Sequence, residues 1–343
     1  MSIATTSPPH AAGISSLHTD ILESHVLTRL DGQTLASASC ASGTIHYMSE
    51  RNDRLWSDVC HSTWPSTSGE LVSKIISTFS DDSNGPRAFF SQSFPLPSPD
   101  PTTAIPPSLS MLSPPSGLIS AVDVYYRNKL IFSKTEETET STSWFRCSPF
   151  RIDLLDPKDM VPTQIPHPDG EDTCTHLIDD MTLSWILIDP VSKRAVNLSS
   201  HKPVSVQRHW LSGEVQVRFA SILAGGNHKH SSEATALVQC GIVVNCGGSE
   251  GGEMQVRELS MEVEDMDGKH LNGRDSLVIL QRTMKGKRGN GVKREEEARD
   301  RHKKFEETKR ERRERKLRVE STLDTLSVAF GLSIFAGLFF ICC

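Results

Sequence analysis

The sequence predicts an α+β protein in which a three-helix N-terminal unit precedes an antiparallel β-sandwich-like domain, a charged helix and a C-terminal hydrophobic helix. Three observations predict this order. Apolar residues recur at helical spacing between residues 18 and 65, and they alternate at strand spacing between residues 118 and 282. Two further helical stretches, one charged and one apolar, end the chain. A length of 343 residues suits one large or two modest domains.

The N-terminal helices are short and amphipathic. Thr19 is a suitable N-cap for the first helix, and Asp31-Gly32 ends it. Small side chains then dominate a second segment from Leu35 to Ser42, and Leu55-Trp56 closes a small core. The apolar face of the first helix contains Ile21, Leu22, His25, Val26, Leu27 and Leu30. These helices are too few to bury a core alone, so we expect them to dock on another surface.

This spacing resembles the F-box, in which two helices are followed by a Leu-Trp pair about forty residues from the start. The segments HTDILESHVLTRLDGQTLASAS and LWSDVCHSTWPS are similar to one family of plant F-box proteins. Later segments such as DVYYRNKLIFSKTEETET and LSWILIDPVSKRAVNLSSHKPVSVQRHWL extend the resemblance over most of residues 15–340. The usual Leu-Pro pairs around the first helix are replaced by Leu17-His18 and Leu30-Asp31.

The resemblance implies a non-catalytic substrate-recognition subunit of an SCF (cullin-RING) E3 ubiquitin ligase. The F-box would bind a Skp-type adaptor on the cullin scaffold, and the β-rich domain would capture an unknown target protein. The residues implied to form the F-box core or its adaptor contact are Ile21, Leu22, Val26, Leu30, Leu35 and Trp56. Two alternatives are a helical cap packed on the chain's own next domain and a membrane-tethered, lectin-like β-sandwich binding protein without a ligase role.

The β-rich domain shows several local signals. Arg127-Asn128 is a plausible turn, and the continuous apolar run from Leu183 to Ile188 indicates a strand that is buried on both faces. Alternation along residues 254–263 changes phase at Glu258, which predicts a β-bulge, and residues 277–280 are expected to form the last strand. The expected segments are a leader (1–14), the F-box (15–66), a connecting helix (67–94), a Pro-rich linker (95–117), the β-rich domain (118–284), a charged stalk (285–322) and a membrane-associated tail (323–343).

The C-terminal end combines charge and hydrophobicity. Residues 285–318 contain 16 Lys/Arg and 8 Asp/Glu, so they carry +8 within a chain whose net charge is -6. With so few apolar residues, the stalk is expected to be an exposed helix. Residues 326–343 are uncharged, and 18 helical residues span roughly 27 Å, close to the thickness of a thin bilayer. The residues expected to enter the membrane are Leu326, Phe330, Ile334, Phe335, Leu338, Phe339, Phe340 and Ile341.

This tail predicts attachment to the cytosolic face of an intracellular membrane, because basic residues precede the apolar run. The alternatives are a buried C-terminal helix and lipidation of Cys342 or Cys343. The first residues, MSIATTSPPHAAG, lack the features of a signal peptide, so a cytoplasmic or nuclear location is expected otherwise. The eight cysteines show no CxxC spacing and are expected to be free thiols.

The sequence lacks the common catalytic motifs: there is no phosphate-binding loop, no GxSxG and no HExxH. His228 with His230 and Cys174 with His176 lack the further ligands of a zinc site. The basic stretch contains a single aromatic residue, Phe305, and its acids halve its charge, which argues against nucleic-acid binding. We therefore expect no cofactor, no metal and no nucleic acid.

Overall fold

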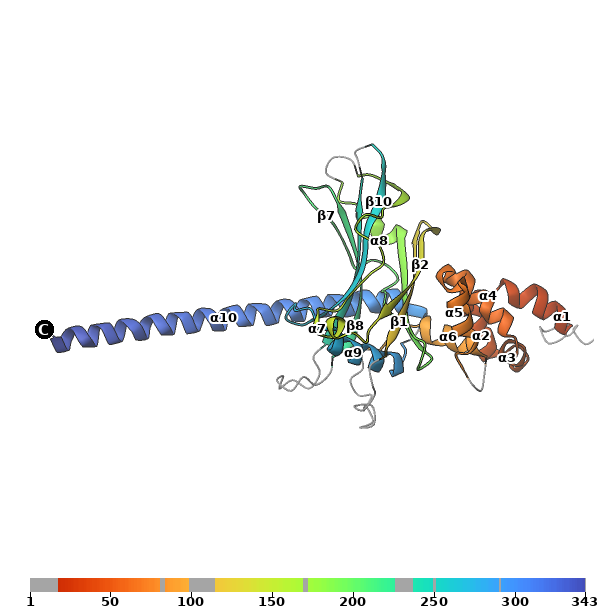
Figure 1. The fold of residues 1–343 in the computed structure, drawn as a ribbon, viewed down its shortest axis with the longest axis horizontal. Coiled ribbons are helices and arrows are strands. Elements are labelled where there is room, and N and C mark those ends of the chain that lie inside the picture. The colour runs from red at the N-terminus through yellow and green to blue at the C-terminus, as the bar shows by residue number, and fades with distance from the viewer. Residues whose placement is uncertain are drawn as a thin grey trace, which may run out of the picture.

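The computed structural model describes residues 18–80, 84–98, 115–168, 172–225, 237–248, 251–289 and 291–342, without the side chains of Val292 and of residues 333–342. Figure 1 shows the N-terminal helices at one end of the molecule, the β-rich domain in the middle and the long helix α10 projecting from the other end. The predicted leader, most of the Pro-rich segment and the pair His228 and His230 lie outside the described residues.

The N-terminal part is helical, as the spacing of its apolar residues predicts. A first helical segment is irregular and is divided into α1 (Thr19–Ile21), the π-helical turn η2 (Leu22–Val26) and the 3-10 turn η3 (Leu27–Arg29). The elements that follow are α2 (Gly32–Ala41), α3 (Gly43–Glu50), α4 (Asp53–Thr63), η4 (Pro65–Ser68), α5 (Glu70–Ser77) and α6 (Gly85–Ser93).

The middle of the chain forms two antiparallel sheets. The strands are β1 (Gly117–Tyr126), β2 (Lys129–Glu139), β3 (Arg151–Asp153), β4 (Val161–Pro166), β5 (Met181–Asp189), β6 (Arg194–Asn197), β7 (Ser205–Arg208), β8 (Val215–Ala224), β9 (Leu237–Gly247) and β10 (Glu253–Asp265). One sheet has the order β2-β1-β5-β6, and the other has the order β3-β10-β9-β8-β7 with β4 also paired to β10. Short helices α7 (Ser143–Cys147) and α8 (Leu177–Asp180) lie between strands in the chain.

A continuous apolar core fills the space between the two sheets. Strand β1 contributes Val122 and Val124, and strand β5 contributes Trp185, all with no exposed surface. The larger sheet contributes Phe219 and Ile242, which are equally buried. Burial of side chains from both inner faces is the arrangement of a β-sandwich, so the predicted α+β class with a sandwich-like domain is confirmed.

The smaller sheet is covered on its other face by the N-terminal helices. Side chains alternate along its strands, so Ile119 and Ala121 of β1 and Ile186 and Ile188 of β5 point away from the sandwich core. All four belong to a second apolar cluster, which they share with residues of α2 to α6. Strand β5 is therefore buried on both faces, as its continuous apolar run predicts.

Two local predictions about the strands are confirmed. Arg127 and Asn128 have φ of 49° and 62° and connect β1 to β2 as a tight turn. The register of β10 against β9 shifts between Val256 and Glu258, which is the β-bulge that the phase change indicates.

One predicted strand is a helix. Residues 277–280 lie in α9 (Gly273–Lys285), which begins after the N-cap Asn272. The side-chain oxygen of Asn272 accepts from the backbone N–H of Asp275 at 2.8 Å. Leu277, Leu280 and Met284 then recur at helical spacing on the buried side. The apolar run Leu277–Leu280 was therefore too short to distinguish a buried helix from a buried strand.

The charged stalk is helical, but its first half is not the exposed stalk that the sequence predicts. After the 3-10 turn η6 (Gly291–Lys293), helix α10 (Arg294–Cys342) first lies against the larger sheet. Phe305 is 1% exposed and packs with Ile222 of β8 and Met266. Ala298 is buried as well, and the ion pairs Lys309–Glu264 and Lys316–Asp267 add to the contact between α10 and the β-rich domain.

Candidate functional site

The helical end of the molecule is organised by N-cap hydrogen bonds. Asp31 caps α2, because its carboxylate accepts from the backbone N–H of Thr34 at 2.8 Å, and this hydrogen bond holds its pKa below the usual value. Asp31 thus starts the second helix as well as ending the first. At the first helix, His18 occupies the N-cap position that the sequence assigned to Thr19.

Four of the six residues predicted for the F-box core or its adaptor contact lie inside the helical unit. Leu22, Leu35 and Trp56 are at most 2% exposed, and Leu30 is half-buried. The indole N–H of Trp56 donates to the backbone carbonyl of Ser49 at 3.0 Å, which satisfies its only polar group. Leu35 and Trp56 pack where α2, α3 and α4 meet, whereas Leu30 keeps part of its surface exposed.

The other two predicted residues face solvent. Ile21 is 47% exposed and Val26 is 36% exposed, on the first helical segment. Tyr47 of α3 is 60% exposed. In Figure 1 this segment and α3 lie at the end of the molecule farthest from α10. Exposed apolar side chains such as these can be buried by a partner, and the described residues leave all three uncovered.

Aromatic packing fixes the helical unit to the smaller sheet. Trp64 is 1% exposed, and its ring lies 5.4 Å from that of Phe90 and 5.9 Å from that of Phe89, measured between centroids. Its indole N–H donates to the hydroxyl of Ser184 on β5 at 3.2 Å. Trp64 therefore packs within the helical unit and is hydrogen-bonded to the smaller sheet. The spacing of apolar residues in the sequence did not reveal this contact.

A buried carboxylate makes a second connection between the layers. Asp123 of β1 has no exposed surface, and Ser66 donates to it from the backbone N–H at 2.9 Å and from the hydroxyl at 2.6 Å. The hydroxyl of Ser133 on β2 donates to the same carboxylate at 2.7 Å. Burial raises the pKa of Asp123, and these hydrogen bonds oppose the rise.

Arg288 ties the helical unit to α9 and β6. Its Nε donates to the carbonyl of Gln92 at 2.8 Å, and Nη2 donates to the carbonyls of Ala195 at 2.8 Å and Met284 at 3.0 Å. Burial lowers the pKa of Arg288 to about 10, which still leaves it charged at neutral pH. Together with Trp64 and Asp123, Arg288 holds the helical unit at one orientation on the β-rich domain.

The described residues contain no group of three or more His, Cys, Asp or Glu side chains that could hold a metal ion. Cys174, Cys240 and Cys246 are buried free thiols, and burial raises the pKa of each. A raised thiol pKa lowers the population of the reactive thiolate. These cysteines therefore contribute to packing.

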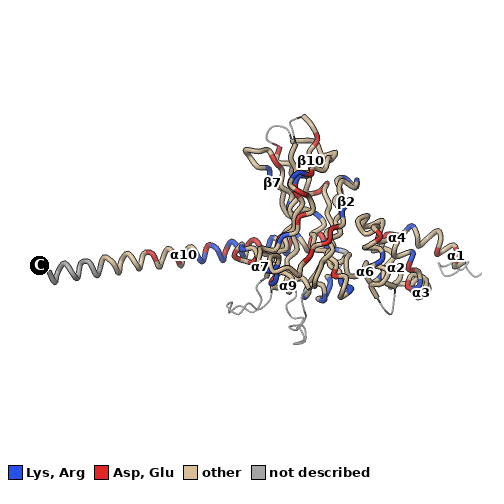
Figure 2. Tube along the Cα trace, viewed as in Figure 1, with Lys and Arg blue, Asp and Glu red and all other residues tan. Residues whose placement is uncertain are grey.

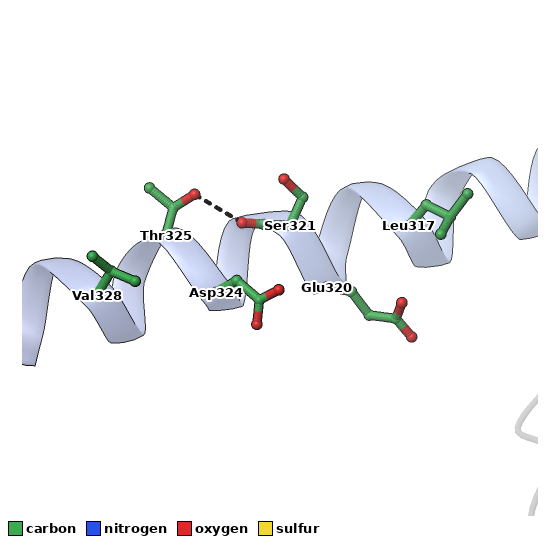
Figure 3. Close-up of a pocket in the computed structure, with 6 residues that line it drawn as sticks. All are labelled: Leu317, Glu320, Ser321, Asp324, Thr325 and Val328. Carbon is green, nitrogen blue, oxygen red and sulfur yellow. Dashed lines mark hydrogen bonds between the residues drawn. The ribbon is translucent and has the colours of Figure 1, made fainter.

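The outer half of α10 is uncovered. A hollow on it is lined by Leu317, Glu320, Ser321, Asp324, Thr325 and Val328, all from this one helix. Figure 3 shows these side chains spreading from a single ribbon, with the hydroxyl of Thr325 donating to the carbonyl of Ser321 at 2.8 Å. A hollow without a second wall cannot enclose a small ligand.

The side chains of the predicted membrane tail are described only as far as Leu332. Leu326 is 61% exposed and Phe330 is 69% exposed. The side chains of Ile334, Phe335, Leu338, Phe339, Phe340 and Ile341 lie outside the described residues. Within the described part of the chain, no helix combines the length and the apolar character needed to cross a membrane, so the predicted span is not supported there.

Three curated proteins of Arabidopsis thaliana are similar to this chain over nearly its whole length. "Probable F-box protein At2g36090" is 50% identical over 331 residues, covering 96% of this chain and 93% of its own. "F-box protein At2g27310" is 40% identical over 341 residues, 97% of both chains. "F-box protein At3g44326" is 43% identical over 319 residues, covering 91% of this chain and 86% of its own. No protein-family model and no solved structure matches the chain.

Proposed function

The chain belongs to the plant F-box proteins, and on this basis we propose that it is the substrate-recognition subunit of an SCF ubiquitin ligase. F-box proteins are generally adaptor subunits, so this chain would supply binding surfaces, and the chemistry would occur on a ubiquitin-loaded enzyme brought close to the target. The N-terminal helices would bind a Skp-type adaptor on the cullin scaffold, and the β-rich domain would hold the target protein.

The exposure of Ile21 and Val26 carries this proposal. Both side chains lie on the first helical segment, whose inner side is closed by Leu22 and Leu27. An apolar pair that its own chain does not bury is suited to a partner protein, because burying it removes apolar area from water. The implied adaptor set thus divides into a buried group and an exposed pair, and Tyr47 of α3 is a further exposed side chain of the helical unit.

The fixed position of the helical unit on the β-rich domain supports the same function. Trp64, Asp123 and Arg288 connect it to strands and helices of the β-rich domain. The first helical segment points away from that contact in Figure 1. A receptor of this shape would hold its target at a constant distance from the adaptor, which favours transfer because the reacting groups stay near each other.

Calorimetric titration of the full chain with a plant Skp-type adaptor tests the proposal. The double variant Ile21→Asp with Val26→Asp should weaken binding by at least about tenfold, because two charges would enter an apolar interface. Its thermal unfolding should match the wild type, since both side chains are exposed. The matched control is Leu71→Asp, which places a charge at a 53% exposed leucine of α5 and should bind normally. Normal adaptor binding by the double variant would rule out this surface.

We also propose that the apolar C-terminal run attaches the receptor to a membrane surface. The support is the uncharged sequence from residue 326 to residue 343, the basic residues before it and the exposure of Leu326 and Phe330. Removing residues 323–343 should move the protein from the membrane fraction to the supernatant of plant cell extracts. A wild-type chain found wholly in the supernatant would overturn this part of the proposal.

A further inference from the structure

A second surface lies where α10 passes the turn after β10. The two elements border a groove of about 1040 Å³. One wall is α10, and the other includes Met266, Asp267 and Gly268, with Val204 nearby. The buried side chain of Phe305 packs against Met266 beneath this region and holds the walls together. In Figure 1, α10 leaves the β-rich domain on the side away from the helical unit.

Four basic side chains follow one stripe of the helix along this groove. Arg299, Lys303, Arg310 and Arg313 are separated by four, seven and three residues, so they fall on one helical face. All four are exposed. Among the described residues, none of the four has a carboxylate oxygen within 4.0 Å, as an ion pair would require. Figure 2 shows Lys and Arg positions interspersed with Asp and Glu along α10 where it passes and leaves the domain.

The acids of the groove are mostly occupied by other cations. Glu264 pairs with Lys309 at 2.8 Å, and Asp267 pairs with Lys316 at 2.9 Å. The hydrogen bond from Lys316 holds the pKa of Asp267 below its usual value, so this carboxylate stays ionised and paired with the helix. In all, six Lys/Arg and four Asp/Glu side chains line the groove, which leaves it with a charge of +2. Burial lowers the pKa of His302, so this side chain adds no charge near neutral pH.

We propose that this groove binds an acidic peptide segment of the captured target. The stripe offers unpaired cations at intervals of about 6, 10.5 and 4.5 Å along the helix axis, distances that carboxylates on alternate residues of an extended chain can match. The wall formed by Met266, Asp267 and Gly268 would contact the peptide backbone. This inference rests on the proposed receptor function, because the peptide is assigned to a target.

The concave shape favours a peptide over an anionic membrane. A bilayer is flat on this scale, and the wall formed by Met266 to Gly268 stands beside the basic stripe. Glu306 and Glu307 also line the groove and would repel a dense layer of phosphate headgroups. A peptide can enter between the walls and place its carboxylates against the arginines and Lys303 alone.

Fluorescence anisotropy with a labelled oligoglutamate peptide tests the groove in the full chain kept in mild detergent. The double variant Lys303→Glu with Arg310→Glu should bind at least about tenfold more weakly than wild type, and added salt should weaken wild-type binding. The matched control is Lys304→Glu with Arg315→Glu, which makes the same charge change on exposed residues of α10 outside the groove lining. This control should retain most of the affinity.

Two outcomes would overturn the groove as a peptide site: equal losses in the two double variants, or unchanged binding in the groove variant. Vesicles of phosphatidylserine form the second arm. If the groove variant loses vesicle binding but keeps peptide binding, the surface contacts lipid instead. Titration of the same variants with the adaptor distinguishes the groove proposal from the receptor proposal. The groove substitutions should leave the affinity for the adaptor unchanged. Failure of the wild-type chain to bind the adaptor would reject the receptor function alone.

Discussion

Ser66 and Asp123 join the two halves of this protein through a buried carboxylate. Ser66 lies in η4, just after the last F-box helix, and donates to Asp123 from both its backbone N–H and its hydroxyl, at 2.9 and 2.6 Å. Thr135 of β2 in turn donates to the backbone carbonyl of Ser66 at 2.7 Å. A buried charge with several donors is strongly tied to one geometry, so this contact fixes where the helical unit leaves the sheet.

Two substitutions of Asp123 distinguish the contribution of its hydrogen bonds to stability from the contribution of its charge. Asp123→Ala should lower the free energy of unfolding by about 1–3 kcal/mol, because it leaves buried donors of Ser66 and Ser133 without an acceptor. Asp123→Asn keeps an acceptor oxygen and should cost less. Urea unfolding at neutral pH measures both changes. Equal losses for Ala and Asn would mean that the hydrogen bonds of Asp123 contribute little.

The raised pKa of Asp123 predicts that the free energy of unfolding depends on pH. Burial raises the pKa of Asp123 above its unfolded value of 3.8, so the folded protein holds this proton to higher pH than the unfolded chain. Its contribution to stability is therefore greatest below pH 3.8 and falls as the pH rises through the folded pKa. The Asn variant lacks this titration, so its stability relative to wild type should rise over that window. A constant difference between the two proteins across urea melts from acid to neutral pH would refute the assignment.

Asp31 should show the opposite sign. The backbone hydrogen bond from Thr34 lowers its pKa, so its contribution is present above pH 3.8 and disappears as the pH falls through the lower folded pKa. Asp31→Ala should cost about 1 kcal/mol at neutral pH, the usual cost of losing an N-cap. Asp31→Asn retains a capping oxygen and is the control. Thermal melts of the three proteins at neutral and strongly acid pH would show whether the difference closes in acid.

Gly273 is expected to tolerate no side chain. A Cβ at this first residue of α9 would lie 2.1 Å from the backbone carbonyl oxygen of Phe145. Gly273→Ala should therefore destabilise the protein by about 1–3 kcal/mol, because backbone must move. Gly43 is the matched control, since it is also the first residue of a helix and a Cβ there meets nothing within 4 Å. Gly43→Ala should be neutral or stabilise by up to about 1 kcal/mol, and a similar loss for both variants would contradict the packing at Gly273.

Phe305 should control whether α10 stays on the β-rich domain. Phe305→Ala removes the buried ring that packs with Ile222 and Met266, and we expect the local opening free energy to fall by about 3 kcal/mol. Trypsin should then cleave the helix faster at its many Lys and Arg residues. Phe330→Ala, at a ring that is 69% exposed, is the control and should leave the cleavage rate unchanged. Equal cleavage of wild type and Phe305→Ala would show that the ion pairs alone hold the helix.

Many local features could be predicted because they depend on neighbouring residues. The turn at Arg127 and Asn128, the bulge at Glu258 and the doubly buried strand β5 all follow from short patterns of turn residues and apolar side chains. The helices of the F-box segment follow from 3.6-residue spacing and from the resemblance to plant F-box proteins. By contrast, the short apolar run in α9 fits both the strand and the helix pattern, and the strand predicted there is wrong.

Contacts between distant segments could not be predicted in this way. The resemblance to F-box proteins implied the six residues, but only the fold separates the buried Leu22, Leu35 and Trp56 from the exposed Ile21 and Val26, because burial depends on which side the other helices cover. The sequence alone determined the helices of the F-box segment, the doubly buried strand β5 and the basic, then apolar, C-terminal end. Only the tertiary structure decided that the helical unit shares a core with the smaller sheet and that Phe305 docks α10, since both depend on side chains meeting across long separations in the chain.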